Sequence, residues 1–455
     1  MKDSAGVVIV GAGIAGVAVA YELAVRRGLG DVVLVDEGTP LALTSDKSTE
    51  CYRDWWPGPD GAMVALMERS IDRLDQLAAE SGNAFHMNRR GYVFASADPA
   101  HAAEMAGRSD IVAGFGAGPF RRHTGSAGDP PYPVQSSVGF DRSLRGADLI
   151  LDRRLIREEF PYLADDVVVV LHARRCGWLS AQQLGMYLLE RAREHGLRLV
   201  RARVEGVAVQ GGAVAEVRTS RGTIATENVV DAAGPHAREV ARMVGVDVPL
   251  HNELHAKVAF RDALSVVPRG VPFLVWDDSQ RLYFSDEDRR TLTRERAEIL
   301  GRTFPPGVHL RPEGGPHSDA LLLIWGYDER PTDPVWPPSF DPAYAEICLR
   351  GLARMLPALR SYIGHAPRPV IDGGYYTKTP ENRPLIGPLP VRGALASCAF
   401  GGFGIMAACG AAELLADHLT GTTLPAHASA FHPTRYDDPA YVERLAAWGP
   451  STGQL

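Results

Sequence analysis

The sequence predicts an α/β protein in which a discontinuous dinucleotide-binding domain carries an inserted, mixed and largely antiparallel sheet. Residues 6–37 read as a strand, a glycine turn, a helix and a second strand, which is how a nucleotide-binding unit begins. The strand "NVVDAAG" that would complete this unit comes only at residues 228–234. Short, aromatic-rich strands between residues 246 and 330 indicate the inserted sheet. Because the strands of the unit are far apart in the chain, we expect one domain to be built from separated segments.

The composition is that of an ordinary globular protein. Hydrophobic residues make up 45% and charged residues 23% of the 455 positions, a length that suits two domains. The formal net charge of −7 offers no electrostatic reason to expect nucleic acid or an anionic membrane as a partner. Five cysteines without a CxxC pair argue against a disulfide framework or a zinc ribbon and fit a reducing compartment. The first apolar run, "VVIV", is too short for a secretory signal, so the cytoplasm is the expected location.

One stretch without a charged residue, Ala394 to Ala412, is long enough to span a membrane. Several glycines interrupt it, and the charged sequence "ELLADH" follows directly. These features favour a strand and a glycine loop that enters a buried helix. We therefore expect no membrane span.

The first glycine turn, "GAGIAG", has the spacing that binds a dinucleotide. Gly11 allows the tight turn, Gly13 lets the backbone approach a pyrophosphate, and Gly16 lets the helix pack on the strand. The helix N-terminus offers N–H groups and a favourable dipole to the phosphates. Asp36 lies at the end of the next strand, where a carboxylate accepts hydrogen bonds from ribose hydroxyls. Strand, helix and acid in register predict a Rossmann-like domain, but they do not distinguish NAD from FAD.

The intervening elements follow from periodicity and turn signals. Residues 60–81 have the apolar pattern of an amphipathic helix, and "GYVFAS" predicts a strand. Ser180 is placed to cap the helix "SAQQLGMYLLERAREHG", and turns at Gly211 and Gly222 join the strands that follow. Residues 342–356 read as another helix.

Five further stretches occur in an order typical of one family. The sequence "VVIVGAGIAGVAVAYELA" opens the chain, "TECYR" follows the second strand, and "VVDAAGP", "YYTKTPENRPLIGP" and "FGGFGIMAACGAAELLADHL" come later. Over nearly its whole length the chain thereby resembles the FAD-dependent amine and amino-acid oxidases of the D-amino-acid oxidase superfamily. The resemblance is greatest to the branch of sarcosine oxidase, glycine oxidase and dimethylglycine dehydrogenase.

The resemblance implies a domain division and a cofactor. Residues 1–86, 150–242 and 366–455 would form the discontinuous FAD-binding domain, and residues 87–149 and 243–365 the substrate-binding domain. In the family the FAD is extended, with its pyrophosphate on the first helix and its ring at the junction of the two domains. The positions that match the family's cofactor site are Gly11, Gly13, Ile14, Ala15, Gly16, Asp36, Glu37, Ser48, Thr49, Ala233, Gly234, Gly401, Gly402, Phe403, Gly404 and Ile405.

The stretch "TSDKSTECYRDWWPG" at residues 44–58 would run along the flavin ring into the substrate cavity. By resemblance, Arg53 matches an arginine that clamps the substrate carboxylate, a role suited to a planar bidentate donor. Trp55 and Trp56 would wall an apolar or cationic pocket beside it. A plainer interpretation stays open, in which Arg53 forms an ordinary ion pair with Glu50 or Asp54 and the tryptophans pack between domains.

Two tyrosines match family positions in the substrate cavity. Tyr376 corresponds to a residue that helps to hold the carboxylate, and Tyr283 to a strand position that lines the cavity. Each is equally compatible with a core aromatic residue whose hydroxyl binds backbone.

Departures from the family pattern matter as well. Gly374 takes the place of a cysteine that carries covalent FAD in some relatives, and residues 44–53 contain no histidine, so non-covalent FAD is predicted. Ile324 stands where the oxidase branch has a lysine that promotes the reaction with oxygen. Met406 replaces a second carboxylate-binding lysine, for which Lys257 compensates only if it faces the cavity rather than solvent.

The resemblance implies FAD-dependent oxidation of a C–N bond in an amine or amino acid, by hydride transfer to flavin N5 that leaves an imine. Oxygen is one possible electron acceptor; a dehydrogenase with another acceptor and a non-catalytic flavin-holding subunit are the alternatives. No metal is expected, because "HNELH" at 251–255 lacks the HExxH order. A hydrolase triad is not expected either, since no GxSxG motif occurs.

Overall fold

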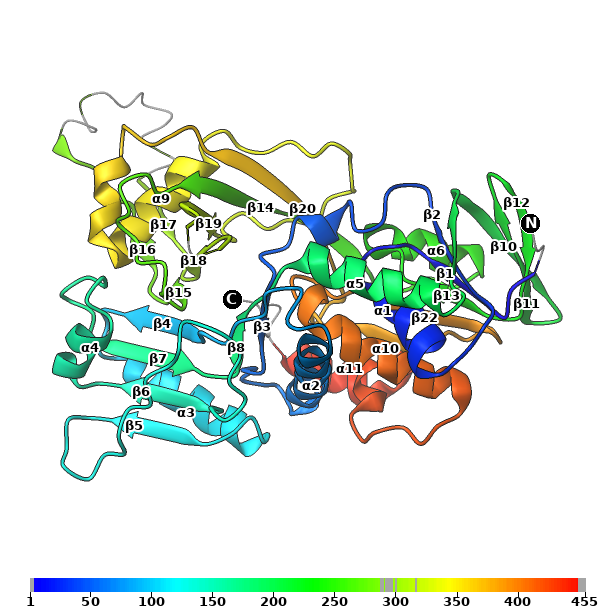
Figure 1. Ribbon diagram of the computed structural model, residues 1–455, viewed down its shortest axis with the longest axis horizontal. Helices are drawn as coiled ribbons and strands as arrows, with labels where there is room; N and C mark the ends of the chain where they lie inside the picture. The colour runs from blue at the N-terminus through cyan, green and yellow to red at the C-terminus, as the bar shows by residue number, and fades with distance from the viewer. Residues whose placement is uncertain (1–3, 287–289, 291–297, 299–300, 316, 449–455) are drawn as a thin grey trace.

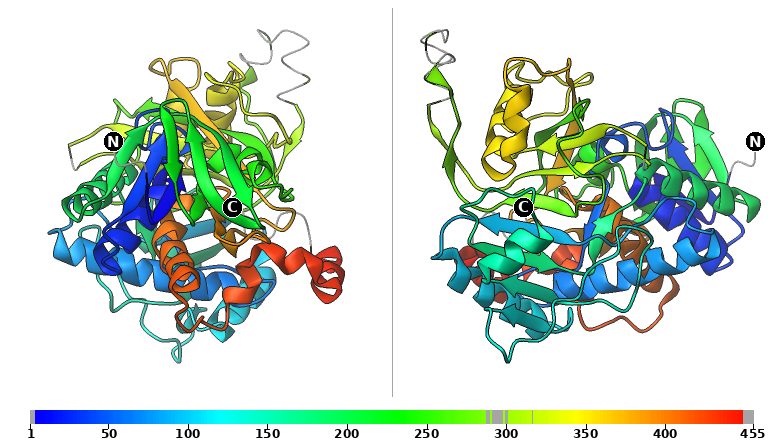
Figure 2. Two further views of the ribbon diagram at one scale, coloured as in Figure 1. Left: turned by 90° about the vertical axis from the view of Figure 1, so that its right-hand side faces the viewer. Right: turned by 60° about the vertical axis from the view of Figure 1, so that its left-hand side comes forward.

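The computed structural model describes residues 4–286, 290, 298, 301–315 and 317–448. Figure 1 shows two lobes with the long helix α2 (Ala62–Glu80) between them. One lobe contains a six-stranded sheet and the N-terminus, and the other a nine-stranded sheet. The right-hand view of Figure 2 shows α9 (Tyr344–Met355, yellow) at the end of the molecule opposite to the blue N-terminal strands.

The six-stranded sheet has the order β21-β22-β13-β1-β2-β9 and is parallel except for β21. Its strands are β1 (Val7–Val10), β2 (Val32–Asp36), β9 (Arg198–Arg201), β13 (Val229–Asp231), β21 (Leu385–Pro388) and β22 (Ala394–Cys398). All four residues of β1 are buried. A parallel strand covered on both faces is expected to be an unbroken apolar run, as "VVIV" is.

Two layers cover this sheet. On one face, a hydrophobic core joins it to α1 (Ile14–Tyr21), α2, α5 (Ala181–Glu194) and α10 (Gly404–Thr420). On the other, a second core joins it to α6 (Ala237–Met243) and to a three-stranded antiparallel sheet of β10 (Val204–Gln210), β11 (Ala213–Thr219) and β12 (Gly222–Ala225). The predicted helices at 60–81 and 342–356 and the Ser180 cap are confirmed, the cap through Gln183 N–H donating to Ser180 Oγ.

The nine-stranded sheet has the order β20-β14-β19-β18-β15-β4-β7-β6-β5. Its strands are β4 (Tyr92–Ser96), β5 (Phe120–His123), β6 (Ala147–Ile150), β7 (Val169–Ala173), β14 (His251–Arg261), β15 (Phe273–Trp276), β18 (Val308–Pro312), β19 (Ala320–Ile324) and β20 (Val370–Lys378). Most neighbours pair antiparallel, while β4 with β15 and β5 with β6 are parallel. The expected mixed, largely antiparallel sheet is therefore confirmed.

The remaining elements connect or flank these sheets. They are π-helix η1 (Glu22–Arg26), the 3-10 helices η2 (Thr44–Asp46), η3 (Gly234–His236), η4 (Pro357–Tyr362), η5 (Ala428–Phe431) and η6 (Pro433–Asp437), helices α3 (His101–Gly114), α4 (Arg153–Glu159) and α11 (Pro439–Ala447), and the strand pairs β3 (Cys51–Arg53) with β8 (Cys176–Trp178) and β16 (Gln280–Arg281) with β17 (Thr303–Phe304).

Two of the expected segment boundaries do not match the sheets. Strand β7 lies inside 150–242 and β20 inside 366–455, both assigned to the FAD-binding domain, yet both are strands of the nine-stranded sheet. Strand β20 pairs with β14 from His251↔Lys378 to Ala259↔Val370, a long-range antiparallel register that no local signal encodes. The structure thus assigns 169–173 and 370–378 to the inserted sheet.

The uncharged stretch at 394–412 folds as expected, with β22 leading through a glycine turn into α10. Within the described residues, no helix combines the length and the apolar character that crossing a membrane requires.

Candidate functional site

A cavity of about 520 Å³ opens beyond the carboxyl ends of β1 and β2. Its walls come from the glycine turn before α1, the loop after β2, the ends of β13 and β22, and the turn that opens α10. The edge of β20 at residues 375–377 closes it from the inserted sheet. In open α/β sheets this is the position at which ligands bind.

The glycine turn is built for close approach of backbone. Gly11 has φ of +101°, and a Cβ there would lie 2.5 Å from the carbonyl oxygen of Ala232. A Cβ on Gly16 would overlap with the carbonyl of Gly11. Gly13 lines the cavity, and a side chain there would meet Ser45 Oγ at 3.3 Å. Packing alone therefore requires glycine at positions 11 and 16.

Polar groups at this end suit a nucleotide. Asp36 Oδ2 accepts from the N–H of Ala12 and Oδ1 from the N–H of Gly38, both at 2.7 Å. Because an ionised carboxylate has about four acceptor positions, Asp36 keeps capacity for ribose hydroxyls. Ile14 N–H donates to Ser45 Oγ at 2.9 Å, which ties the loop after β2 to the start of α1. Ile14, Ala15 and Glu37 also line the cavity.

The far end of the cavity is the turn before α10. Gly401 has φ of +48° and donates its N–H to the carbonyl of Thr377 at 2.8 Å, so the turn is joined to β20. A Cβ on Gly402 would lie 2.5 Å from Cε2 of Tyr376. The Tyr376 ring therefore rests on Gly402, at the N-terminus of a 17-residue helix whose dipole favours negative charge.

Two buried polar atoms in the cavity wall form no hydrogen bond with the described residues. Ser397 Oγ and Trp336 Nε1 have no hydrogen-bond partner among the described residues, and both residues line the cavity. Buried donors and acceptors are normally satisfied, so these atoms indicate a polar ligand. Together with the glycine cradle, they fit an extended dinucleotide.

The segment at residues 44–58 only partly lines the cavity. Ser48 lines it, whereas Thr49 lies behind the wall, where its carbonyl accepts from Arg311 Nε at 2.7 Å. Trp56 is 1% exposed and meets the ring of Phe403 edge-on at 5.3 Å between centroids. Trp55 is also buried and lies 5.1 Å from the ring of Phe94. The tryptophans thus pack between the α10 turn and the inserted sheet.

Arg53 is buried beside this contact. Its guanidinium lies 4.4 Å from the centre of the Trp56 ring, and burial lowers its pKa. Glu50, the first proposed ion-pair partner, binds Arg311 at 2.9 Å. Asp54, the second, has a pKa raised well above the usual range by burial and by neighbouring Glu68. Arg53 does not line the cavity described above, so its substrate role stays a prediction.

Tyr283 does not line the cavity described above. Its side chain is 42% exposed and lies under the guanidinium of Arg360. It follows the short strand β16, which pairs with β17 outside the nine-stranded sheet. Gly16 and Phe403 also lie behind the cavity wall, where both pack.

Several lining residues were not among the predicted site residues. They are Leu43, Thr44, Ser45, Ala202, Arg203, Val204, Pro235, His236, Glu239, Met243, Trp336 and Tyr375. The pattern "TPLALTS" before residue 46 offered only a weak loop signal. The others come together because β10, α6 and the chain after β19 converge on the same strand ends.

Lys257 binds the loop after β2. Its Nζ donates to the carbonyls of Asp46 and Ser48 at 3.2 and 3.1 Å. Burial lowers its pKa, although nearby carboxylates oppose the shift. Lys257 is therefore neither an exposed lysine nor a residue of the cavity wall.

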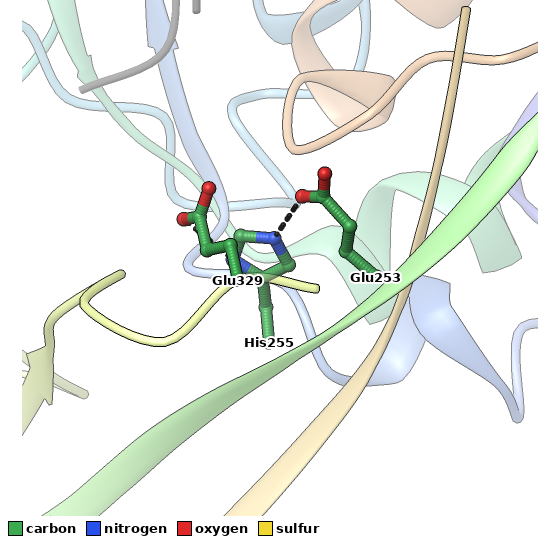
Figure 3. A group of neighbouring side chains, drawn as sticks. All are labelled: Glu253, His255 and Glu329. Atoms are coloured by element: carbon green, nitrogen blue, oxygen red, sulfur yellow. Dashed lines mark hydrogen bonds and ion pairs between the residues drawn. The ribbon is translucent and has the colours of Figure 1, made fainter. Parts of the chain in front are cut away.

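Next to Tyr376 lies a group of charged and titratable side chains, Glu253, His255, Glu329 and Lys378. Figure 3 shows His255 between Glu253 and Glu329. These three residues have the types and the proximity of a metal site, but Lys378 Nζ lies 2.5 Å from Glu253 and 3.7 Å from Glu329. An ammonium group therefore already supplies the cation that these carboxylates require.

The fold and the cavity define an α/β dinucleotide-binding protein with a second sheet closing its ligand site. The chain belongs to the family of FAD dependent oxidoreductases, whose model matches residues 6–418, and the predicted family and FAD cofactor are thereby confirmed.

Relatives with curated names are distant. Mitochondrial dimethylglycine dehydrogenase of Rattus norvegicus is 24% identical over 446 residues, covering 96% of this chain and 45% of that protein. The Homo sapiens protein of the same name is 24% identical over 440 residues, again 96% of this chain and 45% of the relative. The chain thus spans less than half of the length of these relatives.

Solved structures share the fold. L-proline dehydrogenase from P. horikoshii superposes with a TM-score of 0.74 at 20% identity, covering 96% of this chain and 99% of that one. Glycine oxidase from Geobacillus kaustophilus gives 0.71 at 19% identity, covering 95% and 99%.

Proposed function

We propose that the protein oxidises a C–N bond in an amine or amino acid with non-covalent FAD. One observation carries the proposal: a single cavity joins the glycine cradle of α1 to the α10 turn and to Tyr376 of the inserted sheet. An extended FAD in this cavity would have its ring where the two sheets meet. The names of the similar proteins, which include a dimethylglycine dehydrogenase and a glycine oxidase, support this substrate class.

Different residues of the cavity would bind different parts of the FAD. Gly11, Gly13 and the start of α1 would hold the pyrophosphate, and Asp36 a ribose. When bound, the flavin would supply the redox chemistry, which is acceptance of a hydride from the carbon next to the substrate nitrogen, so that the substrate becomes an imine. The helix N-terminus at Gly402 would stabilise the negative charge that the cofactor then carries.

Substrate orientation is assigned to Tyr376 and Arg53. The Tyr376 ring lies against Gly402, and burial raises the pKa of its hydroxyl, so the group remains a hydrogen-bond donor at neutral pH. Arg53 lies over the ring of Trp56, which in turn meets the ring of Phe403 in the α10 turn edge-on. A carboxylate that reaches Arg53 would gain a charge-assisted, bidentate hydrogen bond.

The absence of a covalent link is supported by space as well as by residue type. A side chain at position 374 would meet Thr44 Cα at 3.1 Å and Lys47 Cβ at 3.2 Å. The strand therefore runs tightly against the loop after β2, and a cysteine there would require that loop to move.

A second candidate is a dehydrogenase that uses an acceptor other than oxygen. Ile324, on the strand next to β14, offers no charge to a superoxide ion. Lys257 instead places a positive charge near the cavity, because its Nζ donates a hydrogen bond to the carbonyl of Ser48, a residue of the cavity wall. Whether its ammonium can promote the oxygen reaction separates the two candidates.

The deciding experiment is anaerobic mixing of the FAD-loaded protein with a panel of amines and amino acids. Loss of the flavin's visible absorbance identifies a substrate, and admission of air then times reoxidation. Fast recovery with hydrogen peroxide indicates an oxidase, and slow recovery indicates a dehydrogenase. A flavin that no compound in the panel bleaches would contradict the proposal and favour a non-catalytic flavin-holding subunit.

A further inference from the structure

Residues 331–336 form a strap between β19 and α9 that pairs with β14 beside the cavity. Its start is fixed to β14, because Thr332 N–H donates to the carbonyl of Asn252 at 2.8 Å. The Asn252 side chain donates in turn to the carbonyl of Pro235, a residue of the cavity wall, at 3.0 Å. The strap therefore begins where the inserted sheet meets the nucleotide-binding domain.

The hydroxyl of Tyr375, on β20, holds the middle of the strap. It accepts from Val335 N–H at 2.8 Å and donates to the carbonyl of the same residue at 2.9 Å. The Val335 side chain is 63% exposed, so its burial contributes little to holding the strap. Two hydrogen bonds with one buried phenol therefore fix the backbone immediately before Trp336.

Trp336 separates the cavity from solvent at this point. Its side chain lines the cavity, whereas Val335 and Pro337 on either side of it are exposed. The Trp336 ring also meets the Tyr375 ring edge-on, with centroids 5.2 Å apart. The strap itself is thus the cavity wall here, and the position of Trp336 decides how far the cavity is closed.

A dinucleotide bound in the cavity would gain from this arrangement in two ways. The indole N–H of Trp336 is a buried donor with no hydrogen-bond partner among the described residues, which suits an acceptor on the cofactor. A ring held over the cavity also hinders the cofactor from leaving until the strap has moved away. Segments held by few contacts open locally at a lower free-energy cost than global unfolding, so the bonds that hold the strap set how often it opens.

We propose that Tyr375 is a positioning residue that latches this strap: its hydroxyl holds Val335 and thereby keeps Trp336 against bound FAD. The inference rests on the part of the proposed function that places FAD in the cavity, and not on the identity of the substrate. Without the hydroxyl, the strap opens more often, FAD leaves faster, and Trp336 contributes less to FAD affinity.

The first test compares two tyrosines that have the same bonding pattern. Tyr344 Oη accepts from Trp325 N–H at 2.9 Å and donates to the carbonyl of Ala256 at 2.7 Å, but Tyr344 does not line the cavity described above. Tyr375→Phe should accelerate FAD release about tenfold, the effect of losing one or two hydrogen bonds, whereas Tyr344→Phe should leave the rate unchanged. The rate is measured after strong dilution of the loaded proteins, from the fluorescence of the released flavin. An unchanged rate in Tyr375→Phe, or an equal acceleration in both variants, would overturn the inference.

A double-mutant cycle tests whether the hydroxyl acts through Trp336. Trp336→Phe should weaken FAD binding in the wild-type background, and the same change should have a clearly smaller effect in the Tyr375→Phe background. Equal effects in both backgrounds would refute the latch, even if Tyr375→Phe alone released FAD faster.

Neither readout requires a substrate. If no amine or amino acid bleached the flavin, the proposed oxidation would fail, while the rates of FAD release would still decide the role of Tyr375.

Discussion

The contact between Gly402 and Tyr376 predicts a large effect from one methyl group. In Gly402→Ala the new Cβ would lie 2.5 Å from Cε2 of Tyr376, about 1 Å closer than ordinary contact. The ring cannot retreat easily, because His255 stacks on it at 3.9 Å. Overpacking of this kind costs about 1–3 kcal/mol, and relief by a shift of the α10 turn would disturb the N–H groups that we propose bind the flavin.

Gly404 offers the matched control. A Cβ there would meet its nearest atoms, Phe400 Cβ and Ile14 Cγ2, at 3.5 and 3.8 Å, which are ordinary contacts. Gly404→Ala should therefore leave the packing of the turn unchanged, whereas Gly402→Ala should weaken FAD binding by about five- to 150-fold if the whole cost falls on the loaded form. FAD affinity is measured by titrating the apoprotein and following flavin fluorescence. Urea unfolding of both apoproteins shows how the cost divides.

The physical reason can be tested by removing the ring. In a Tyr376→Ala background the methyl group of Gly402→Ala meets no ring, so its cost should largely vanish, a coupling that a double-mutant cycle measures. Equal FAD affinities for Gly402→Ala and Gly404→Ala, or a cost that persists without the Tyr376 ring, would refute the reasoning.

Four further changes test other parts of the site. Arg53→Lys keeps the charge but loses the planar fork, so half-saturation by carboxylate substrates should rise about tenfold while amines without a carboxylate are unaffected; equal effects on both would remove Arg53 from the clamp role. If the Lys257 ammonium assists the reaction with oxygen, Lys257→Met should slow flavin reoxidation in air with little change in anaerobic bleaching. An unchanged reoxidation rate, measured by stopped-flow absorbance, would exclude this role. Trp336→Phe keeps an aromatic ring but loses the buried indole N–H, and it should weaken FAD binding about fivefold, as measured by fluorescence titration. An unaltered FAD affinity would mean that this N–H donates to no acceptor on the cofactor. Burial raises the pKa of Asp231 to about 8, although the N–H of Ala233 donates to its carboxylate. The native state therefore holds a proton that the unfolded state releases. The free energy of unfolding should fall as the pH rises toward 8, by up to about 1.4 kcal/mol per pH unit. Asp231→Asn should flatten that slope in urea titrations, and an equal slope in both proteins would contradict the assignment.

Short-range signals account for what the sequence predicted correctly. The turn at Gly11 and Gly16 needs glycine because backbone carbonyls occupy the space of a Cβ, so the requirement is readable in one stretch of chain. The unbroken apolar runs of β1 and β2, the Ser180 cap and the strand-to-helix passage at 394–412 are local in the same sense. Family resemblance then added FAD, which the glycine spacing alone did not specify.

Partners distant in the chain decided the rest. Strands β7 and β20 join the inserted sheet through registers with β4 and β14, and a strand's sequence does not state which edge it will meet. Tyr283 lies outside the cavity because the β16–β17 pair is separate from the large sheet.

The amino-acid sequence by itself determined the nucleotide cradle, because the steric demands of a tight turn act between residues a few positions apart. Only the tertiary structure decided that Tyr376 lies between His255 and Gly402, and that Trp336 reaches the cavity. Those contacts form when β14, β20 and α10 pack together, and their free energy depends on atoms that come from separate segments of the chain.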